Sequence, residues 1–188
     1  ATVTVTDNDN DQIVDSTTAS APLSLTITDT DPTLTDVGVP TFDGSLSVVE
    51  AGGAEFAQTI TISPPTYTAS AVDGYTSTVS YALSATEGTV AGWTTSEAAG
   101  GEYAISLVQV DGNTVNGVYI DGNSVQQIAF TVSLNGDEVT LTSLVALEHG
   151  NDPAGSGLGL ALSLGSLVNV VATVTVTDND NDQIVDST

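Results

Sequence analysis

Seventeen residues of this chain occur twice: ATVTVTDNDNDQIVDST spans Ala1 to Thr17 and returns, letter for letter, as Ala172 to Thr188. A long exact repeat outranks local signals in a sequence, because it indicates that the chain is built from recurring units. We therefore expect one full repeat and the overlapping start of the next, cut from a longer tandem array. The fold and the function must suit one unit of such an array.

Each copy of the repeated stretch begins as a strand and ends in a run of acids. In Ala1 to Thr6, valines alternate with threonines, which is the period of a half-buried strand. The run Asp7-Asn8-Asp9-Asn10-Asp11 then places three carboxylates at alternate positions, where they would share one face and repel each other. The run therefore needs either full solvation or a bound cation.

Calcium is the cation that these side chains favour, since it takes about six to eight oxygen ligands from carboxylates, amide carbonyls and backbone. The alternative is a solvated acidic linker, which is typical of an isolated acidic run. The position at a repeat boundary and the nearby acids favour a calcium site that bridges consecutive units. The expected metal ligands are the clustered aspartates Asp7, Asp9, Asp11, Asp29, Asp31, Asp178, Asp180 and Asp182, with Asn8, Asn10, Asp15, Glu50 and Asp186 as further candidates.

Two known calcium motifs do not fit the acidic run. An EF-hand that starts at Asp7 needs Gly at its sixth position and Glu at its twelfth, where this chain has Gln12 and Thr18. The Gly-rich nonapeptide of calcium-loaded β-rolls is also absent, because the segment Gly155 to Gly159 contains no Asp. The run is closer to the Asp/Asn linkers between cadherin domains, although Thr6 stands where those linkers have Asp.

The composition excludes several classes of partner. The 188 residues include 24 Asp and Glu and no Lys or Arg, so the formal net charge is −24. Such a field repels nucleic acids and anionic membranes, and it opposes compaction until cations bind. The chain is nevertheless 40% hydrophobic and has no Cys, so we expect a folded domain without disulfides, in which metal ions serve as staples. No apolar run is long enough to insert into a membrane.

Alternating apolar residues and turn signals recur along the whole chain, and no stretch has a convincing helical period. The fold class expected from this pattern is all-β: an antiparallel β-sandwich, immunoglobulin-like but elaborated, with Asp/Asn-rich interdomain linkers. The pattern places strands at 23–28, 45–50, 58–63, 75–85, 103–110, 114–120, 125–134 and 167–177, with a hairpin turn at Asn135-Gly136. Trp93 is expected to be a core anchor or a loop plug.

The repeat also fixes the expected domain boundaries. Residues 1–11 would be the last strand of the preceding unit plus a linker, 12–177 the sandwich domain, and 178–188 the next linker and the start of the next unit. Residues 1–6 would then lack sheet partners of their own. Whether 12–177 is one sandwich or two subdomains stays open, and a single domain is favoured.

The last third of the chain resembles the tandem-repeat domains of giant bacterial RTX adhesins that are exported by type I secretion. The resemblance rests on AFTVSLNGDEVTLTSLVALEHGND, from Ala129, and on VVATVTVTDNDND, which ends at Asp182. Members of that family end in an Asp-Gly-Asp run, where this chain has Asn in place of Gly. The resemblance implies an extracellular stalk on the bacterial surface, active in adhesion and biofilm formation, with calcium at its joints and neighbouring copies of the repeat as partners. It implies no obligate oligomer.

No catalytic constellation is expected. His149 is the only His, and no Cys is present to complete a zinc site with it. Catalysis by Glu148 and His149 would also need a nucleophile or paired groups in a pocket, and the sequence indicates none. A structural His is therefore favoured, and we expect no enzyme. The main functional hypothesis is an extender repeat that Ca²⁺ stiffens, and the alternative is a carbohydrate- or surface-binding β-sandwich module of the same kind of adhesin.

Overall fold

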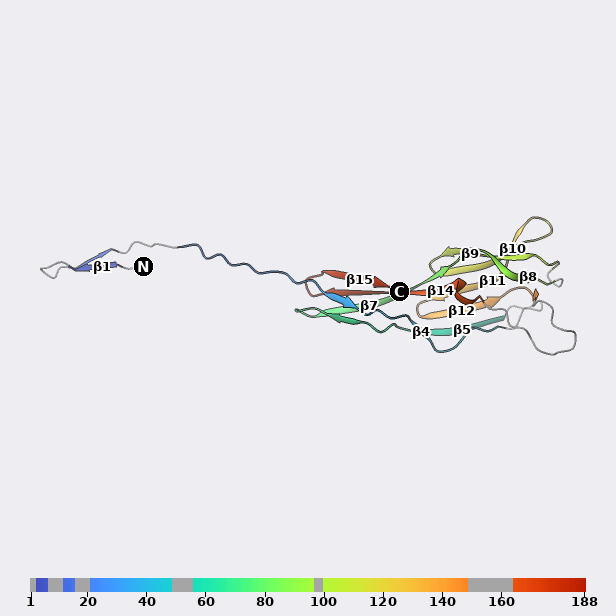
Figure 1. Ribbon diagram of the computed structural model, residues 1–188, viewed down its shortest axis with the longest axis horizontal. Coiled ribbons are helices and arrows are strands. Elements are labelled where there is room, and N and C mark those ends of the chain that lie inside the picture. The colour runs from blue at the N-terminus through green and yellow to red at the C-terminus, as the bar shows by residue number, and fades with distance from the viewer. Residues whose placement is uncertain (1–2, 7–11, 16–20, 49–55, 97–99, 149–163) are drawn as a thin grey trace. The chain divides into compact units, whose positions relative to one another are not determined.

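The computed structural model (Figure 1) describes residues 3–6, 12–15, 21–48, 56–96, 100–148 and 164–188. The chain divides into two compact units, Ala1–Thr30 and Asp31–Thr188. Among the described residues, no helix is long and apolar enough to cross a membrane.

The described residues of the first unit include one pair of antiparallel strands. Strand β1 (Val3–Thr6) pairs antiparallel with β2 (Gln12–Asp15), so that Val3 lies opposite Asp15 and Thr6 lies opposite Gln12. The expectation that residues 1–6 have no sheet partner was therefore wrong. It overlooked that Ile13 and Val14 continue the strand-like pattern beyond the acidic run and can fold back on β1.

Residues 21–30 of the first unit have no regular secondary structure, although a strand was predicted at 23–28. The side chains of Leu23, Leu25 and Ile27 are 79%, 81% and 97% exposed. An alternating pattern becomes a strand only where a neighbouring strand completes the ladder and an apolar surface covers one face. The described residues provide neither for this segment, so the prediction was wrong here.

The second unit consists of antiparallel sheets. Its strands are β3 (Thr33–Thr35), β4 (Thr41–Phe42), β5 (Phe56–Ser63), β6 (Thr68–Ser70), β7 (Tyr75–Ala85), β8 (Gly88–Thr95), β9 (Ala104–Asp111), β10 (Thr114–Ile120), β11 (Gln126–Asn135), β12 (Glu138–Ser143), β13 (Leu147–Glu148), β14 (Val168–Asp178) and β15 (Gln183–Ser187). A 3₁₀ turn, η2 (Gly165–Leu167), precedes β14. The sheet orders are β13-β8-β9-β10-β11-β12-β5-β4, β15-β14-β7 and β3-β6. This architecture confirms the predicted all-β antiparallel sandwich class.

The larger hydrophobic core lies on one face of the eight-stranded sheet. Its side chains come from alternate positions of the strands, for example Ile105 and Leu107 of β9, which are 0% and 1% exposed. Trp93 packs against this core, with its ring tilted against Phe130 at a centroid distance of 5.5 Å. The prediction of Trp93 as a core anchor is therefore confirmed.

Strands β7 and β14 connect the larger core to a smaller one. They pair along their full length, from Val168 opposite Ala85 to Asp178 opposite Tyr75. Val168 and Val170 at the start of β14 pack against the larger core. Toward its end, Val174 and Val176 are fully buried in the smaller cluster, which includes Leu34 of β3 and Ala69 of β6.

The segment 178–188, predicted to be a linker and the start of the next unit, lies within the second unit. It forms a hairpin turn and strand β15, which runs back along β14 (Figure 1). Ile184 of β15 packs against the smaller cluster. The hairpin places the acidic residues at the end of β14.

Candidate metal site

The acidic run Asp178 to Asp182 forms the turn between β14 and β15. The backbone N–H of Asp182 donates to Oδ1 of Asp178 at 2.8 Å, and the N–H of Asp178 donates to the Asp182 carbonyl at 3.1 Å. Asn181 has a φ of 77°, a left-handed conformation that Asn tolerates better than most residues. The Asp and Asn residues are thus the types that this turn requires.

A second turn, between β6 and β7, lies against the first. The side-chain amide of Asn179 donates a hydrogen bond to the backbone carbonyl of Asp73. Next to Asp73, Gly74 has a φ of 95°, and a Cβ atom at Gly74 would lie 3.1 Å from Nδ2 of Asn179. Glycine therefore allows both the backbone conformation and the close approach of the two turns.

These two turns bring three carboxylates together. Asp73, Asp178 and Asp180 each offer one carboxylate oxygen, and the three oxygens lie within 4.8 Å of one another. Asp73 and Asp180 are exposed, whereas Asp178 is only 5% exposed. Their mutual repulsion has no compensation from Lys or Arg, because the chain contains neither.

The buried oxygen of Asp178 tests whether a cation fits this site. Oδ2 of Asp178 is buried and has no hydrogen-bond partner, while Oδ1 is occupied by the turn. An unpaired buried carboxylate oxygen costs free energy unless a charge of opposite sign satisfies it. A hard divalent cation with oxygen ligands meets this requirement, so Asp73, Asp178 and Asp180 fit Ca²⁺.

Of the predicted ligands, the structure brings Asp178 and Asp180 together, and a carboxylate oxygen of Asp182 also lies within 4.8 Å of one from Asp180. Asp182 is half-buried at the end of the same turn. Asp186 lies opposite Val174 in the hairpin, away from the turn, and its carboxylate accepts from the N–H of Ser187. Asp186 is therefore not placed with the cluster.

The remaining predicted ligands come from other segments of the chain. Asp29 belongs to the first unit, is exposed, and accepts a hydrogen bond from the N–H of Thr30 at 2.9 Å. Asp31 is exposed at the start of the second unit. Asp15 ends β2, opposite Val3. The predicted ligands Asp7, Asn8, Asp9, Asn10, Asp11 and Glu50, and the single His149, lie outside the described residues.

Sequence reasoning missed Asp73. The signal that could have revealed it is the Asp73-Gly74 pair directly before a predicted strand at 75–85. If this strand pairs antiparallel with the last one, its first residues meet the last residues of that strand, where the acidic run begins. The prediction considered only acids that are close in sequence, and not acids that the pairing of these two strands brings together.

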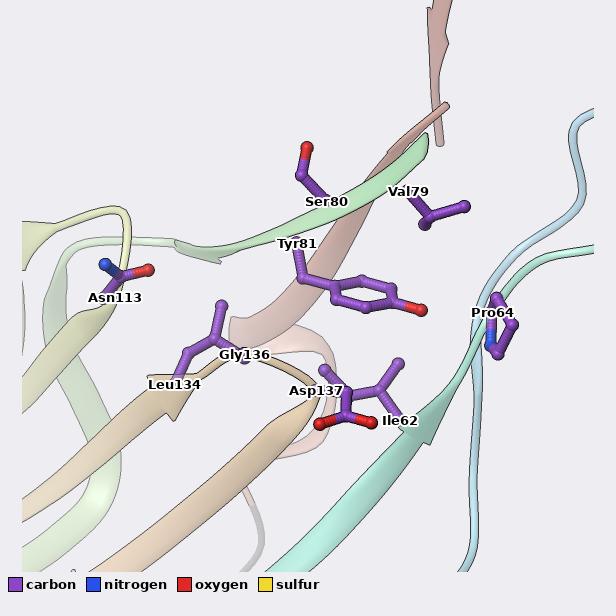
Figure 2. A pocket seen from close by; sticks show the side chains of 9 residues that line it. All are labelled: Ile62, Pro64, Val79, Ser80, Tyr81, Asn113, Leu134, Gly136 and Asp137. Carbon is purple, nitrogen blue, oxygen red and sulfur yellow. The ribbon is translucent and has the colours of Figure 1, made fainter. Parts of the chain in front are cut away.

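A separate hollow of about 640 Å³ lies between β7, the end of β5 and the β11–β12 turn (Figure 2). It is lined by Ile62, Pro64, Val79, Ser80, Tyr81, Asn113, Leu134, Gly136 and Asp137. Burial, and secondarily the nearby Asp137 carboxylate, raise the pKa of the Tyr81 hydroxyl above its usual value. Tyr81 is the only aromatic side chain in this lining, and its hydroxyl points toward Pro64 (Figure 2).

Comparison with known proteins gives one match. The model of a family described as "Domain of unknown function (DUF5801)" matches residues 24–188. No curated protein and no solved structure matches the chain.

Proposed function

The chain belongs to the DUF5801 family of domains of unknown function, and we propose that it is a structural extender repeat of a giant secreted adhesin of the bacterial surface. In this proposal, Ca²⁺ stabilises the acidic turns of each repeat and stiffens the stalk. The partners are neighbouring copies of the same repeat.

The observation that carries this proposal is the buried, unpartnered Oδ2 of Asp178 beside the carboxylates of Asp73 and Asp180. Asp73 precedes β7, whereas Asp178 ends β14 and Asp180 lies in the turn that follows it. A cation held by all three residues would join the ends of β7 and β14, two strands of the three-stranded sheet β15-β14-β7. It would therefore stabilise the part of the domain that packs around the smaller cluster.

The energetic effect depends on the ion concentration. A ligand that binds only the folded state stabilises it by RT ln(1 + [L]/Kd), which is about 3–4 kcal/mol per site when the ratio is several hundred. Inside a cell, where free calcium is scarce, the carboxylates repel each other and the chain stays loosely folded. Outside the cell, where calcium is abundant, the same chain folds tightly. This dependence suits a protein that is exported before it folds.

The exact repeat of seventeen residues supports the tandem arrangement, and the net charge of −24 supports a partner that is a cation and not a nucleic acid or an anionic membrane. The strands and turns, with the larger and the smaller core, form a scaffold, and the acidic cluster is its candidate metal site. These features are those of a load-carrying repeat.

Small-angle scattering of a protein that carries two consecutive repeats tests the proposal. In calcium, we expect an extended, rigid particle. After chelation, the two repeats should move relative to each other, and the average maximum dimension of the particle should decrease. The same scattering curve under both conditions would contradict the proposed stiffening. A matched protein in which Asp178 and its equivalent in the other repeat are replaced by Asn should show no calcium response.

The alternative function, carbohydrate binding, has the hollow beside Tyr81 as its candidate site. Its polar groups, among them Ser80, Asn113 and Asp137, are of the kinds that form hydrogen bonds with sugar hydroxyls. A glycan array discriminates between the two functions. Specific binding that is lost in Tyr81→Ala would favour the alternative, and no binding would favour the extender repeat.

A further inference from the structure

The turn that carries Asp73 is tied to the acidic run by a side chain of that run. This turn connects β6 to β7, and Val72 within it is 85% exposed, so Val72 adds little apolar packing. The side-chain amide of Asn179 donates a hydrogen bond to the backbone carbonyl of Asp73. Since a carbonyl oxygen can only accept, the amide nitrogen is the atom of Asn179 that must face it.

The residues on either side of Asn179 cannot make this bond. Asp178 and Asp180 carry carboxylates, which only accept hydrogen bonds when they are ionised and which repel the carboxylate of Asp73. The chain has no Lys or Arg that could donate in their place. The neutral amide therefore holds the backbone of Asp73 in a position from which the repulsion among three carboxylates would otherwise drive it.

The two asparagines of the run have different tasks. Asn181, with a φ of 77°, shapes the backbone of its own turn. Asn179 reaches the facing turn, where Gly74 leaves room for it, since a Cβ atom at Gly74 would lie 3.1 Å from Nδ2 of Asn179. The approach of the amide is thus matched by the absence of a side chain on the facing turn.

We propose that Asn179 is a positioning residue of the metal site. It holds Asp73 beside the other two carboxylates, and it thereby sets both the affinity of the site for Ca²⁺ and its preference for Ca²⁺ over Mg²⁺. The inference rests on the proposed calcium site. Asn179 acts through Asp73, because its amide bonds the backbone of that residue.

The preference follows from what the two ions require. Ca²⁺ takes about six to eight oxygen ligands, whereas Mg²⁺ keeps several waters and is bound through one or two carboxylates. Asp178 and Asp180 belong to the same run and can serve Mg²⁺ without Asp73. Ca²⁺ gains more from the third carboxylate, so the loss of the Asn179 bond should weaken the binding of Ca²⁺ more than that of Mg²⁺.

Isothermal titration calorimetry of the full chain with Ca²⁺ and with Mg²⁺ tests the inference. We expect Asn179→Ala to bind Ca²⁺ about three- to tenfold more weakly, because the ordering of one ligand is worth roughly this much affinity. The loss should not exceed that of Asp73→Asn. The affinity for Mg²⁺ should change by less than about twofold. A merely structural role of Asn179 would weaken the binding of both ions equally.

Asn169→Ala is the matched control. The side-chain amide of Asn169 donates to the backbone carbonyl of Ser166 at 2.8 Å, near the other end of β14. This substitution removes the same kind of hydrogen bond from the same strand, away from the cluster. It should leave the affinities for both ions unchanged.

The double variant Asp73→Asn with Asn179→Ala separates positioning from direct binding. If Asn179 acts through Asp73, the double variant should bind Ca²⁺ as weakly as Asp73→Asn alone. A further loss in the double variant would overturn the inference, because Asn179 would then contribute independently of Asp73.

Two other results would also overturn it: an Asn179→Ala variant that binds both ions like the wild type, or one that loses the same affinity for both. These outcomes leave the calcium site itself intact. A wild type that binds no Ca²⁺ would instead refute the proposed metal site, and this inference with it.

Discussion

Asp73 and Asp178 are far apart in the sequence, yet carboxylate oxygens of the two residues lie within 4.8 Å of each other, together with one from Asp180. Asp178 is nearly fully buried and Asp73 is exposed, so the cluster has one oxygen inside the protein and others open to solvent. This arrangement lets an ion enter from water and still satisfy the buried Oδ2. Substitutions in the cluster should therefore have opposite effects on stability with and without calcium.

The effect of Asp178→Asn on the stability of the protein should have opposite signs with and without calcium. Without calcium, the substitution removes an unpaired buried charge next to two carboxylates, while the amide oxygen still accepts from Asp182 N–H; we expect stability to rise by about 1–3 kcal/mol. With calcium, the variant should gain nothing from the ion and become the less stable protein. Denaturant unfolding in calcium and in chelator measures both effects.

Asp186→Asn is the matched control, because Asp186 is exposed in the same hairpin but away from the turn. It removes the same charge and should keep the full calcium response. A loss of the response in both variants would mean that net charge, and not the cluster, governs stability.

Asp73→Asn tests whether the ion is held within one domain. The substitution leaves the backbone carbonyl that Asn179 contacts, but removes one carboxylate from the cluster. We expect calcium to bind about tenfold more weakly, or about 1.4 kcal/mol, in isothermal titration calorimetry. Asp137→Asn, an exposed aspartate in the β11–β12 turn, is the control and should leave the affinity unchanged. Equal affinities of the two variants would place the ion elsewhere.

Gly117 is required by the packing of Phe130. The two residues lie opposite each other on β10 and β11, and a Cβ atom at Gly117 would lie 2.2 Å from Cε1 of the Phe130 ring. Gly117→Ala should therefore destabilise the protein by about 1–3 kcal/mol through overpacking. Combining it with Phe130→Leu should cost less than the sum of the two single changes, in a double-mutant cycle of unfolding free energies. Simple additivity would contradict the steric explanation.

Asp121 should make the second unit sensitive to acid. Its carboxylate accepts from the N–H groups of Val125 and Asn123 and from the amide of Gln127; mainly the Val125 bond holds the pKa of Asp121 below its usual value of 3.8. A lowered pKa in the folded state contributes stability above the unfolded value, and this contribution is lost as the pH falls through the folded value.

The stability difference between the wild type and Asp121→Ala should therefore be constant near neutral pH and shrink below about pH 4. Urea unfolding in chelator at pH 7, 5 and 3 measures it. A difference that stays the same at pH 3 would show that the ionised carboxylate is not what stabilises the turn.

Much of the fold could be predicted from the sequence, because the strands of the sheets carry their own alternation. The predicted strands at 75–85 and 114–120 coincide with β7 and β10, and the last strand differs by one residue at each end. The hairpin turn at Asn135-Gly136 is centred one residue later, since Asn135 still pairs with Glu138. Local pattern and turn chemistry decide these elements.

Other elements depend on contacts that no local pattern reveals. Strand β8 contains Gly88 and Gly92 and was not predicted, because its partners β9 and β13 provide the ladder. The segment 23–28 alternates well but has no neighbouring strand among the residues that the structure describes. For the site, the acidic run itself was evident, whereas Asp73 joins it only through the pairing of β7 with β14.

Thermal unfolding of the full chain in about 1 mM calcium and in excess chelator is the most direct test of a metal-stabilised repeat. A stabilisation of about 3–4 kcal/mol corresponds to a rise of roughly 10 °C in the melting temperature. We predict this rise for the wild type and for Asp186→Asn, and its loss in Asp178→Asn. Identical melting temperatures of the wild type in calcium and in chelator would contradict the account.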